Sequence, residues 1–441
     1  MPHFSRSTFT ALCLAALLPL TARADLRNYV AKPDASYDVK FLGNHDIGAN
    51  KVVSLQLTSQ TWRGITWTHW LSIIVPAEVE HPDKAVLHIM GGSNKSKQPD
   101  VNSGSAKSLI ALANQTGAIM VILQQVPNQP LFGDRYEDAL IAMTFAKFIE
   151  TQDAEWPLLL PMVKSAVRAM DATQAIAKER LKLEIKEFIV TGASKRGWTT
   201  WLTAAVDKRV IAIAPMVIDV LNFGPQMKHQ EQSYGRLSEE VADYDKLDLP
   251  RQIHTEPGKK LVSLVDPYSY IDKLTIPKLM VLGTNDPYWT VDASSHYFSQ
   301  LLGNKQLYYE PNAGHGLGAG IYPTVIAFFD ASLRGKTLPE LTWKKTGPGA
   351  LSVEWKTKGA MPTLWQATAD SRDFRKAKWT SKALEGEGKA EVKLDAPAKG
   401  WTAFYVGVRF PNDRGLPFVL STEMSVVPET FPHQARPLGT R

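Results

Sequence analysis

Cysteine is nearly absent from this chain. Cys13 is the only cysteine among 441 residues, and it lies in an apolar segment at the N-terminus. If that segment is removed on export, the mature chain has no cysteine, which excludes disulfide bonds, thiolate metal sites and a cysteine nucleophile. A chain without cysteine suits an oxidising compartment, because it cannot form a wrong disulfide bond.

Long apolar runs and concentrated charge are absent as well. After residue 24 no stretch is long and apolar enough to span a bilayer, so no transmembrane segment is expected in the mature chain. The formal net charge is +6, and it falls to +4 without the first 24 residues, which hold two arginines and no acid. This positive excess is scattered, whereas nucleic-acid binding needs a basic face, so no nucleic-acid partner is expected.

Motifs that bind metals and cofactors are also missing. The chain has no HExxH pair, no Walker loop and no dinucleotide-binding fingerprint. The sequence therefore predicts an activity that uses neither a metal nor a cofactor.

Residues 1–24 have the pattern of a secretory signal peptide. Arg6 supplies a positive charge, the run from Thr8 to Leu20 is apolar, and Ala22 and Ala24 form a small-x-small cleavage site. A membrane anchor is the alternative, but the apolar run is short and a cleavage site follows it. We therefore expect a periplasmic or secreted protein.

Strand-like apolar runs alternate with helical patterns over most of the chain. Two β-branched runs, Lys51 to Leu57 and Ile65 to Val75, predict antiparallel strands. Further strands are expected at 84–90, 118–126, 185–190, 210–218, 278–282 and 306–309, and helices at 106–116, 137–150, 158–180, 196–206, 293–302 and 322–333. This alternation predicts an α/β domain over residues 25–338, with a mostly parallel sheet and helices on both faces.

Two segments depart from this alternation. Residues 221–260 are polar, and we interpret them as a cap-like insertion above the sheet; a plain surface excursion is an equal alternative. Residues 339–441 hold short alternating strands and no long helix, which predicts a small C-terminal β-sandwich domain.

A serine between a strand and a helix carries the main chemical signal. Gly192 and Ser194 follow the strand at 185–190, and small residues allow a tight turn there. In α/β-hydrolases the nucleophile sits on such a strand-to-helix turn. Glycine usually stands two residues after the serine, but that position is Arg196 here and the glycine is Gly197. A serine that caps a helix is the alternative, yet the place after a central strand favours a nucleophile.

An acid and a histidine follow the serine in the expected chain order. Asp286 comes directly after the strand at 278–282, and His315 stands between two glycines after the last strand. A serine needs a base in contact and a group that orients this base, and these two residues would supply both. Asp286 could instead be a turn residue before proline, and Asp292 and Asp219 are weaker candidates for the acid.

Backbone amides near the serine are candidates for the oxyanion hole. The amide of Lys195 follows the nucleophile at a helix N-terminus, where the helix dipole favours negative charge. The second amide is expected from the loop after the strand at 84–90, at Gly92 or Ser93, with help from the Asn94 side chain.

Charged and aromatic residues near these motifs are candidates for substrate binding. Lys195 and Arg196 would hold an acidic group, although pairing of Arg196 with a structural carboxylate is a slightly favoured alternative. Glu137 and its neighbour Asp138 would hold a substrate amine, or they are only a charge pair at a helix N-terminus. Tyr288 and Trp289 follow the acid and are expected to line the pocket.

Three segments resemble one known family. They are residues 57–69 (LTSQTWRGITWTH), 156–166 (WPLLLPMVKSA) and 191–201 (TGASKRGWTTW), and they resemble the PhoPQ-activated pathogenicity-related family. The resemblance covers nearly the whole mature chain. It implies an α/β-hydrolase fold, export in bacteria and a triad on Ser194, Asp286 and His315. The elbow is also similar, more thinly, to the Ser-Arg-x-Gly elbow of glucuronoyl esterases.

These observations predict an exported serine hydrolase that forms an acyl-enzyme. The bond cut is an ester or a peptide bond of a restricted substrate, either a small molecule or a short peptide. The alternative is a binding or signalling protein on a hydrolase scaffold, suggested by the unusual Arg196. A protein or a glycan is the possible ligand of the C-terminal domain.

Overall fold

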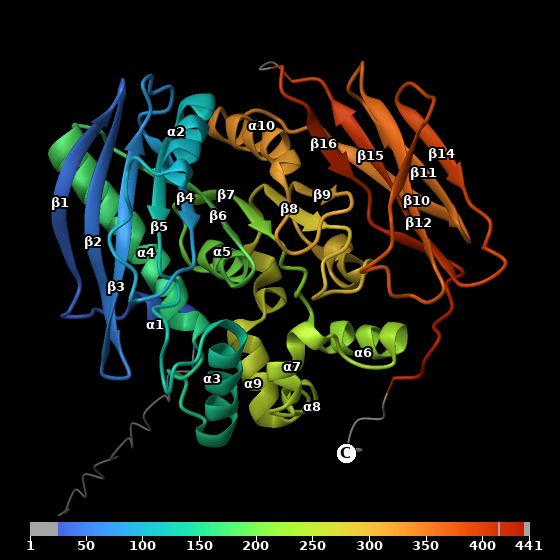
Figure 1. Ribbon diagram of the computed structural model, residues 1–441, viewed down its shortest axis with the longest axis horizontal. Coiled ribbons are helices and arrows are strands. Elements are labelled where there is room, and N and C mark those ends of the chain that lie inside the picture. The colour runs from blue at the N-terminus through green and yellow to red at the C-terminus, as the bar shows by residue number, and fades with distance from the viewer. Residues whose placement is uncertain (1–24, 413–414, 436–441) are drawn as a thin grey trace, which may run out of the picture.

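A computed structural model describes residues 25–412 and 415–435 of the chain (Figure 1). The predicted signal peptide, residues 1–24, lies outside the described residues. Within these described ranges, no helix is both long and apolar enough to cross a membrane.

A parallel sheet forms the centre of the molecule. Its strands are adjacent in the order β5, β4, β6, β7, β8 and β9, and every neighbouring pair is parallel. Three antiparallel strands extend the β5 edge. The bounds are β1 (Asp38–Ile47), β2 (Asn50–Trp62), β3 (Ile65–Val75), β4 (Lys84–Ile89), β5 (Ile119–Leu123), β6 (Glu187–Ala193), β7 (Val210–Met216), β8 (Lys278–Gly283) and β9 (Lys305–Glu310).

Both faces of this sheet are buried, because alternate strand residues point to opposite sides. Val190 packs into the cluster that holds α4 (Leu159–Ile176) and α5 (Lys195–Val206), whereas its neighbour Ile189 packs on the other face. That other face is covered by α2 (Gly104–Thr116) and α10 (Tyr322–Leu333). The predicted α/β architecture with helices on both faces is confirmed.

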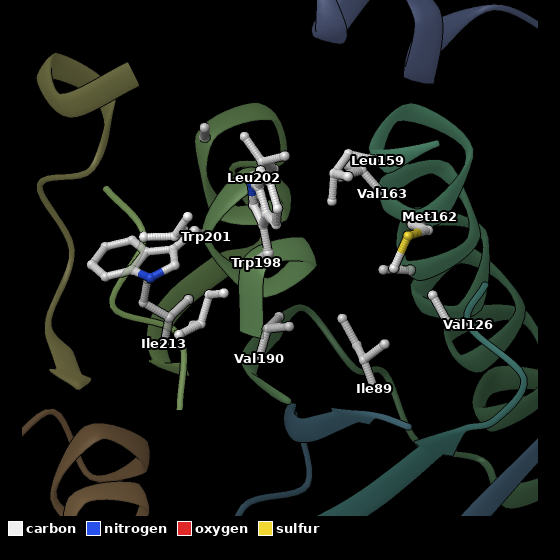
Figure 2. Packing of buried hydrophobic residues seen from close by; sticks show 14 of the residues in the cluster. Ile89, Val126, Leu159, Met162, Val163, Val190, Trp198, Trp201, Leu202 and Ile213 are labelled. Carbon is white, nitrogen blue, oxygen red and sulfur yellow. The ribbon is translucent and has the colours of Figure 1, made fainter. Parts of the chain in front are cut away.

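The helix after Ser194 is anchored by large apolar side chains. Trp198 and Leu202 of α5 lie on the side of Leu159 and Val163 of α4, whereas Trp201 lies on the opposite side of α5, near Ile213 (Figure 2). Trp201 is fully buried. Burying a side chain of this size stabilises the fold by about 1.5–3 kcal/mol, so α5 is held rigidly where it leaves the sheet.

The C-terminal strands form two sheets, at the end of the molecule away from β1 (Figure 1). One sheet joins the central sheet, because β16 pairs with β9 at Ser421 and Leu307. The strands are β10 (Leu341–Gly347), β11 (Ala350–Trp355), β12 (Met361–Ala369), β13 (Thr380–Ala383), β14 (Lys389–Lys393), β15 (Trp401–Phe410), β16 (Phe418–Ser421) and β17 (Ser425–Val427). The division into two domains stays a prediction, and strand pairing crosses the expected boundary.

The segment expected to form a cap is helical. It contains α6 (Phe223–Tyr234), α7 (Ala242–Asp245), α8 (Leu249–Gln252) and α9 (Glu256–Val265). Helices α7, α8 and α9 contact α3 (Glu137–Thr151), and these four helices gather on one side of the sheet (lower part of Figure 1).

Three elements differ from the sequence expectation. The helix expected over 293–302 is two 3₁₀ turns, Ala293–His296 and Phe298–Gln300, because Tyr297 between them has a φ of −147°, outside the helical range. The first strand, β1, and the short helix α1 (Leu26–Ala31) were not expected, since neither has a strong periodic pattern.

A loop from the C-terminal strands reaches back to the carboxyl ends of β8 and β9. We call residues 370–379, between β12 and β13, the bracing loop. The Asn285 side chain donates to the carbonyls of Phe374, Arg375 and Ala377, the last at 2.7 Å. Asn312 exchanges hydrogen bonds with the backbone of Trp379. The bracing loop thereby fixes the two turns that follow β8 and β9.

Replacing Asn285 with alanine tests this brace. The substitution leaves three carbonyl groups without their donor, so we expect the free energy of unfolding to fall by about 1–3 kcal/mol. Denaturant unfolding followed by tryptophan fluorescence measures the change. Asn102→Ala, in an exposed loop, is the matched control and is expected to be neutral. Equal losses in both variants would contradict the bracing role.

Candidate active site

Ser194 occupies a sharp turn between β6 and α5. Its φ of 59° and ψ of −125° are unusual for a residue with a side chain. Its amide donates to the carbonyl of Met216, at 2.9 Å, which ties the turn to β7. Such strain persists only where the surrounding structure enforces it, and it is typical of functional sites.

Two glycines make room for this turn. A Cβ atom on Gly192 would lie 2.8 Å from the backbone oxygen of Arg196. A Cβ atom on Gly197 would lie 2.6 Å from Ile218 and 2.9 Å from the oxygen of Gly192. The strand and the helix therefore approach each other more closely than side chains allow. The displaced glycine, one residue later than in the usual elbow, still meets this steric need.

The structure brings the three residues of the expected triad together. His315 Nε2 lies 2.9 Å from Ser194 Oγ. On the other side of the ring, His315 Nδ1 lies 2.9 Å and 3.1 Å from the two carboxylate oxygens of Asp286. Asp286 is buried, and the His315 side chain is about a quarter exposed. These contacts form a continuous hydrogen-bonded chain from the carboxylate to the serine hydroxyl.

The two weaker candidates for the acid have other surroundings. Asp292 binds His229 Nε2 at 2.7 Å and also pairs with Arg372. Asp219 is buried, and its Oδ1 has no hydrogen-bond partner among the described residues. The pKa of Asp219 is raised to about 7, mainly by burial; the nearby Asp286 carboxylate acts in the same direction, and the Tyr297 hydroxyl acts against it.

The loop after β4 is held by two glutamines. Gln125 donates from its backbone to Gly91 O, at 3.0 Å, and from its side chain to Ser93 O, at 2.7 Å. The Gln129 side chain donates to Gly92 O at 3.2 Å. Because the N–H of a trans peptide points opposite its C=O, these bonds fix the direction of the loop amides. The oxyanion role of Gly92, Ser93 and the Lys195 amide stays a prediction.

Arg196 forms a bidentate ion pair with Glu137. Both guanidinium–carboxylate contacts are 2.7 Å long. Burial raises the pKa of Glu137, but hydrogen bonding and charge from Arg196 outweigh it, so the pKa is lower than usual. The guanidinium also fills the space beside Gly91, where a Cβ would lie 2.5 Å away. Arg196 thus pairs with a structural carboxylate, as the alternative interpretation had it.

A cavity of about 770 Å³, counting space open to solvent, extends from Ser194 beneath the cap helices. Asp138, Lys195, Tyr244, Tyr288 and Trp289 are among its lining residues, whereas Glu137, Arg196 and Asn94 are not. Asn94 instead points its side-chain amide at Pro130 O, 3.2 Å away. The geometry therefore supports a substrate contact for Trp289, and it gives no such support for Asn94, Glu137 or Arg196.

The sequence points to Asp138 and Tyr288 at this site, whereas Tyr244 and Gln125 carry no sequence signal. Asp138 accepts hydrogen bonds from Tyr244 and Tyr288, and Tyr288 also lies against the His315 ring, with centroids 4.3 Å apart. Tyr244 comes from the cap, far along the chain from α3. Gln125 has a positive φ of 63°, which no motif indicated.

Within the described ranges no group of three or more histidine, cysteine or acidic side chains is arranged to hold a metal ion. The expectation that no cofactor is needed stays a prediction.

Comparison with known proteins gives one family and one fold. The PhoPQ-activated pathogenicity-related protein family matches residues 26–375. Autocrine proliferation repressor protein A of Dictyostelium discoideum is 30% identical over 97% of this chain and 95% of its own length.

Among solved structures, acetyl xylan esterase 1 from Thermoanaerobacterium superposes with a TM-score of 0.50 at 16% identity, covering 70% of this chain and 92% of the esterase. An acetyl xylan esterase from Paenibacillus gives 0.48 at 14% identity, covering 69% and 90%. The first of these likenesses confirms the predicted α/β-hydrolase fold.

The close contact at Gly197 gives a direct test of the turn. Gly197→Ala places a methyl group against Ile218 and two carbonyl oxygens, so we expect a loss of about 1–3 kcal/mol in unfolding free energy. Gly104→Ala, at the start of α2 with open space around it, is the matched control and should not destabilise. Denaturant midpoints measure both. An unchanged midpoint for Gly197→Ala would mean that the turn is not tightly packed.

The raised pKa of Asp219 predicts a pH-dependent stability. Between its unfolded value of 3.8 and its folded value of about 7, the folded state binds more protons. The stability contribution is therefore present at low pH and is lost as pH rises through 7. We expect Asp219→Asn to remove about 2 kcal/mol of the decline between pH 5 and pH 7.5. Urea unfolding at both pH values measures the unfolding free energy. If it changes equally with pH in the wild type and in Asp219→Asn, the raised pKa of Asp219 is contradicted.

Proposed function

The chain belongs to the PhoPQ-activated pathogenicity-related protein family, and from this premise we propose that it is an exported serine hydrolase. It would act through an acyl-enzyme on an ester or a peptide bond. Ser194 is the proposed nucleophile, His315 the general base and Asp286 the residue that orients the base.

One observation carries this proposal. The hydrogen-bonded chain from Asp286 through His315 to Ser194 joins three turns that lie far apart in sequence, with Ser194 Oγ 2.9 Å from His315 Nε2. A serine hydroxyl is a weak nucleophile unless a base contacts it, and this geometry supplies the base and its orienting carboxylate. The strained backbone of Ser194 supports the same reading.

The proposed reaction has two steps. His315 Nε2 takes the hydroxyl proton while Ser194 Oγ bonds to the substrate carbonyl carbon, and the amide of Lys195 with one from Gly92 or Ser93 holds the oxyanion. The bond to the leaving group breaks, and the leaving group takes the proton from His315. Water then adds to the acyl carbon by the same route and releases the acid and free Ser194.

The charges beside the serine favour an ester over a peptide with a free amine. Glu137 is paired with Arg196, and Asp138 is paired with Lys195 at 2.6 Å. A substrate ammonium group would therefore meet two carboxylates, those of Glu137 and Asp138, that are already paired. The same two pairs leave no free cation for an acidic substrate group.

The proposed location of the protein outside the cytoplasm depends on the sequence of residues 1–24. Their signal-peptide pattern supports export to the periplasm or beyond. The C-terminal strands remain a candidate binding module for a protein or a glycan.

A signalling function is the second candidate. It is favoured by the relative of 30% identity, whose name describes an autocrine repressor of proliferation. A signalling protein of this kind would need the α/β-hydrolase fold but would not need to hydrolyse a substrate. The two candidates differ in whether Ser194 is reactive.

A fluorophosphonate probe separates them. We expect the probe to label the wild-type protein at Ser194 and to leave Ser194→Ala unlabelled. Removing the base in His315→Ala should lower ester turnover by roughly 10⁴-fold, because an unassisted hydroxyl is a poor nucleophile. Circular dichroism checks that both variants are folded. An unlabelled wild-type serine, beside a control hydrolase that reacts, would favour the signalling function.

A further inference from the structure

The cavity at Ser194 is almost entirely apolar beyond its rim. Its apolar lining comes from the loop after β7, α3, α5 and the cap helices, and includes Phe145, Trp198, Ile218, Met227, Ile253 and Leu261. This apolar lining comes from more residues than a two-carbon acyl group could contact at once.

Four polar side chains at the cavity, Asp138, Lys195, Tyr244 and Tyr288, satisfy one another. Asp138 binds Lys195 Nζ at 2.6 Å and accepts from Tyr244 and Tyr288 at 2.9 Å and 3.0 Å. Lys195 also donates to the Tyr288 hydroxyl at 3.1 Å. Both charged side chains are nearly buried, with 9% and 13% of their surfaces exposed. A charged substrate group entering the cavity would lose its water and find the charges of Lys195 and Asp138 already paired, which is costly.

The position of His315 indicates which part of the substrate occupies the cavity. The leaving group must collect its proton from His315, whose side chain is 26% exposed, while Lys195 and Asp286 are buried. The leaving group is therefore expected on the open side of His315. The acyl group stays bound to Ser194 until water arrives, and the enclosed apolar space is left for it.

We propose that the cavity selects an uncharged, apolar acyl group of medium length, longer than acetyl, and excludes acyl groups that carry a carboxylate. This rests on the proposed serine hydrolase function. The selecting elements are the apolar wall formed by α5 and the cap helices, together with the neutralised Lys195–Asp138 pair.

A series of 4-nitrophenyl esters tests the proposal, because the leaving group is constant. We expect kcat/KM to rise about threefold to fourfold per added CH₂ from acetate towards hexanoate, and to level off once the cavity is full. Hexanoate should exceed the mono-4-nitrophenyl ester of adipic acid, which has the same chain with a terminal carboxylate, by at least about tenfold.

Filling the cavity should reverse this preference. Ile253→Trp narrows the apolar space, so we expect the ratio of hexanoate to acetate kcat/KM to fall at least about fivefold. Leu247→Trp is the matched control, since Leu247 lies in the same cap segment with 39% of its surface exposed and does not line the cavity. The control is expected to keep the wild-type ratio.

The outcomes separate this inference from the proposed function. Labelling of Ser194 together with a preference for acetate, or for the adipate monoester, would overturn the acyl selectivity and leave the hydrolase standing. An equal ratio in Ile253→Trp and Leu247→Trp, with both folded by circular dichroism, would also overturn it. If Ser194 is unlabelled and no ester is cleaved, both proposals fall.

Discussion

The bidentate pair between Arg196 and Glu137 ties the site together. Arg196 belongs to the turn that carries Ser194, Glu137 begins α3, and the guanidinium fills the space beside Gly91 in the loop expected to hold the oxyanion. Two parallel hydrogen bonds between a planar guanidinium and a carboxylate fix the relative orientation of the two groups as well as their distance. One side chain therefore sets the relative positions of the serine turn, the β4 loop and the helix that carries Asp138. Glycine at this position of the elbow could not do so.

Much of this architecture was predictable, because a single sequence already contains the spacing of apolar residues and the order of the motifs along the chain. The strands β3 to β9 and helix α10 follow from apolar runs, and Ser194, Asp286 and His315 follow from their places after strands. Tyr244 and Gln125 were not predictable. Tyr244 meets Asp138 only because the cap folds onto α3, and Gln125 holds its loop through a backbone conformation that no motif marks. Contacts between distant segments leave no local pattern.

Charge beside a nucleophile has a different meaning once pairing is known. In the sequence, Lys195 and Arg196 suggest a site for anions, and Glu137 with Asp138 suggests a site for amines. In the structure the four residues neutralise one another in two pairs, and the cavity that remains is apolar. Binding specificity then depends on desolvation and shape rather than on attraction between charges.

The pairing of β16 with β9 means that the C-terminal strands cannot be removed without uncovering the edge of the central sheet. Strand β9 would otherwise end the central sheet, and an uncovered edge offers unpaired backbone groups to other chains. Here Ser421 pairs with Leu307, its hydroxyl accepts from the Tyr309 amide, and Tyr405 donates to the Tyr309 carbonyl. The C-terminal strands thus cover an edge of the central sheet that would otherwise be open to edge-to-edge pairing with other chains.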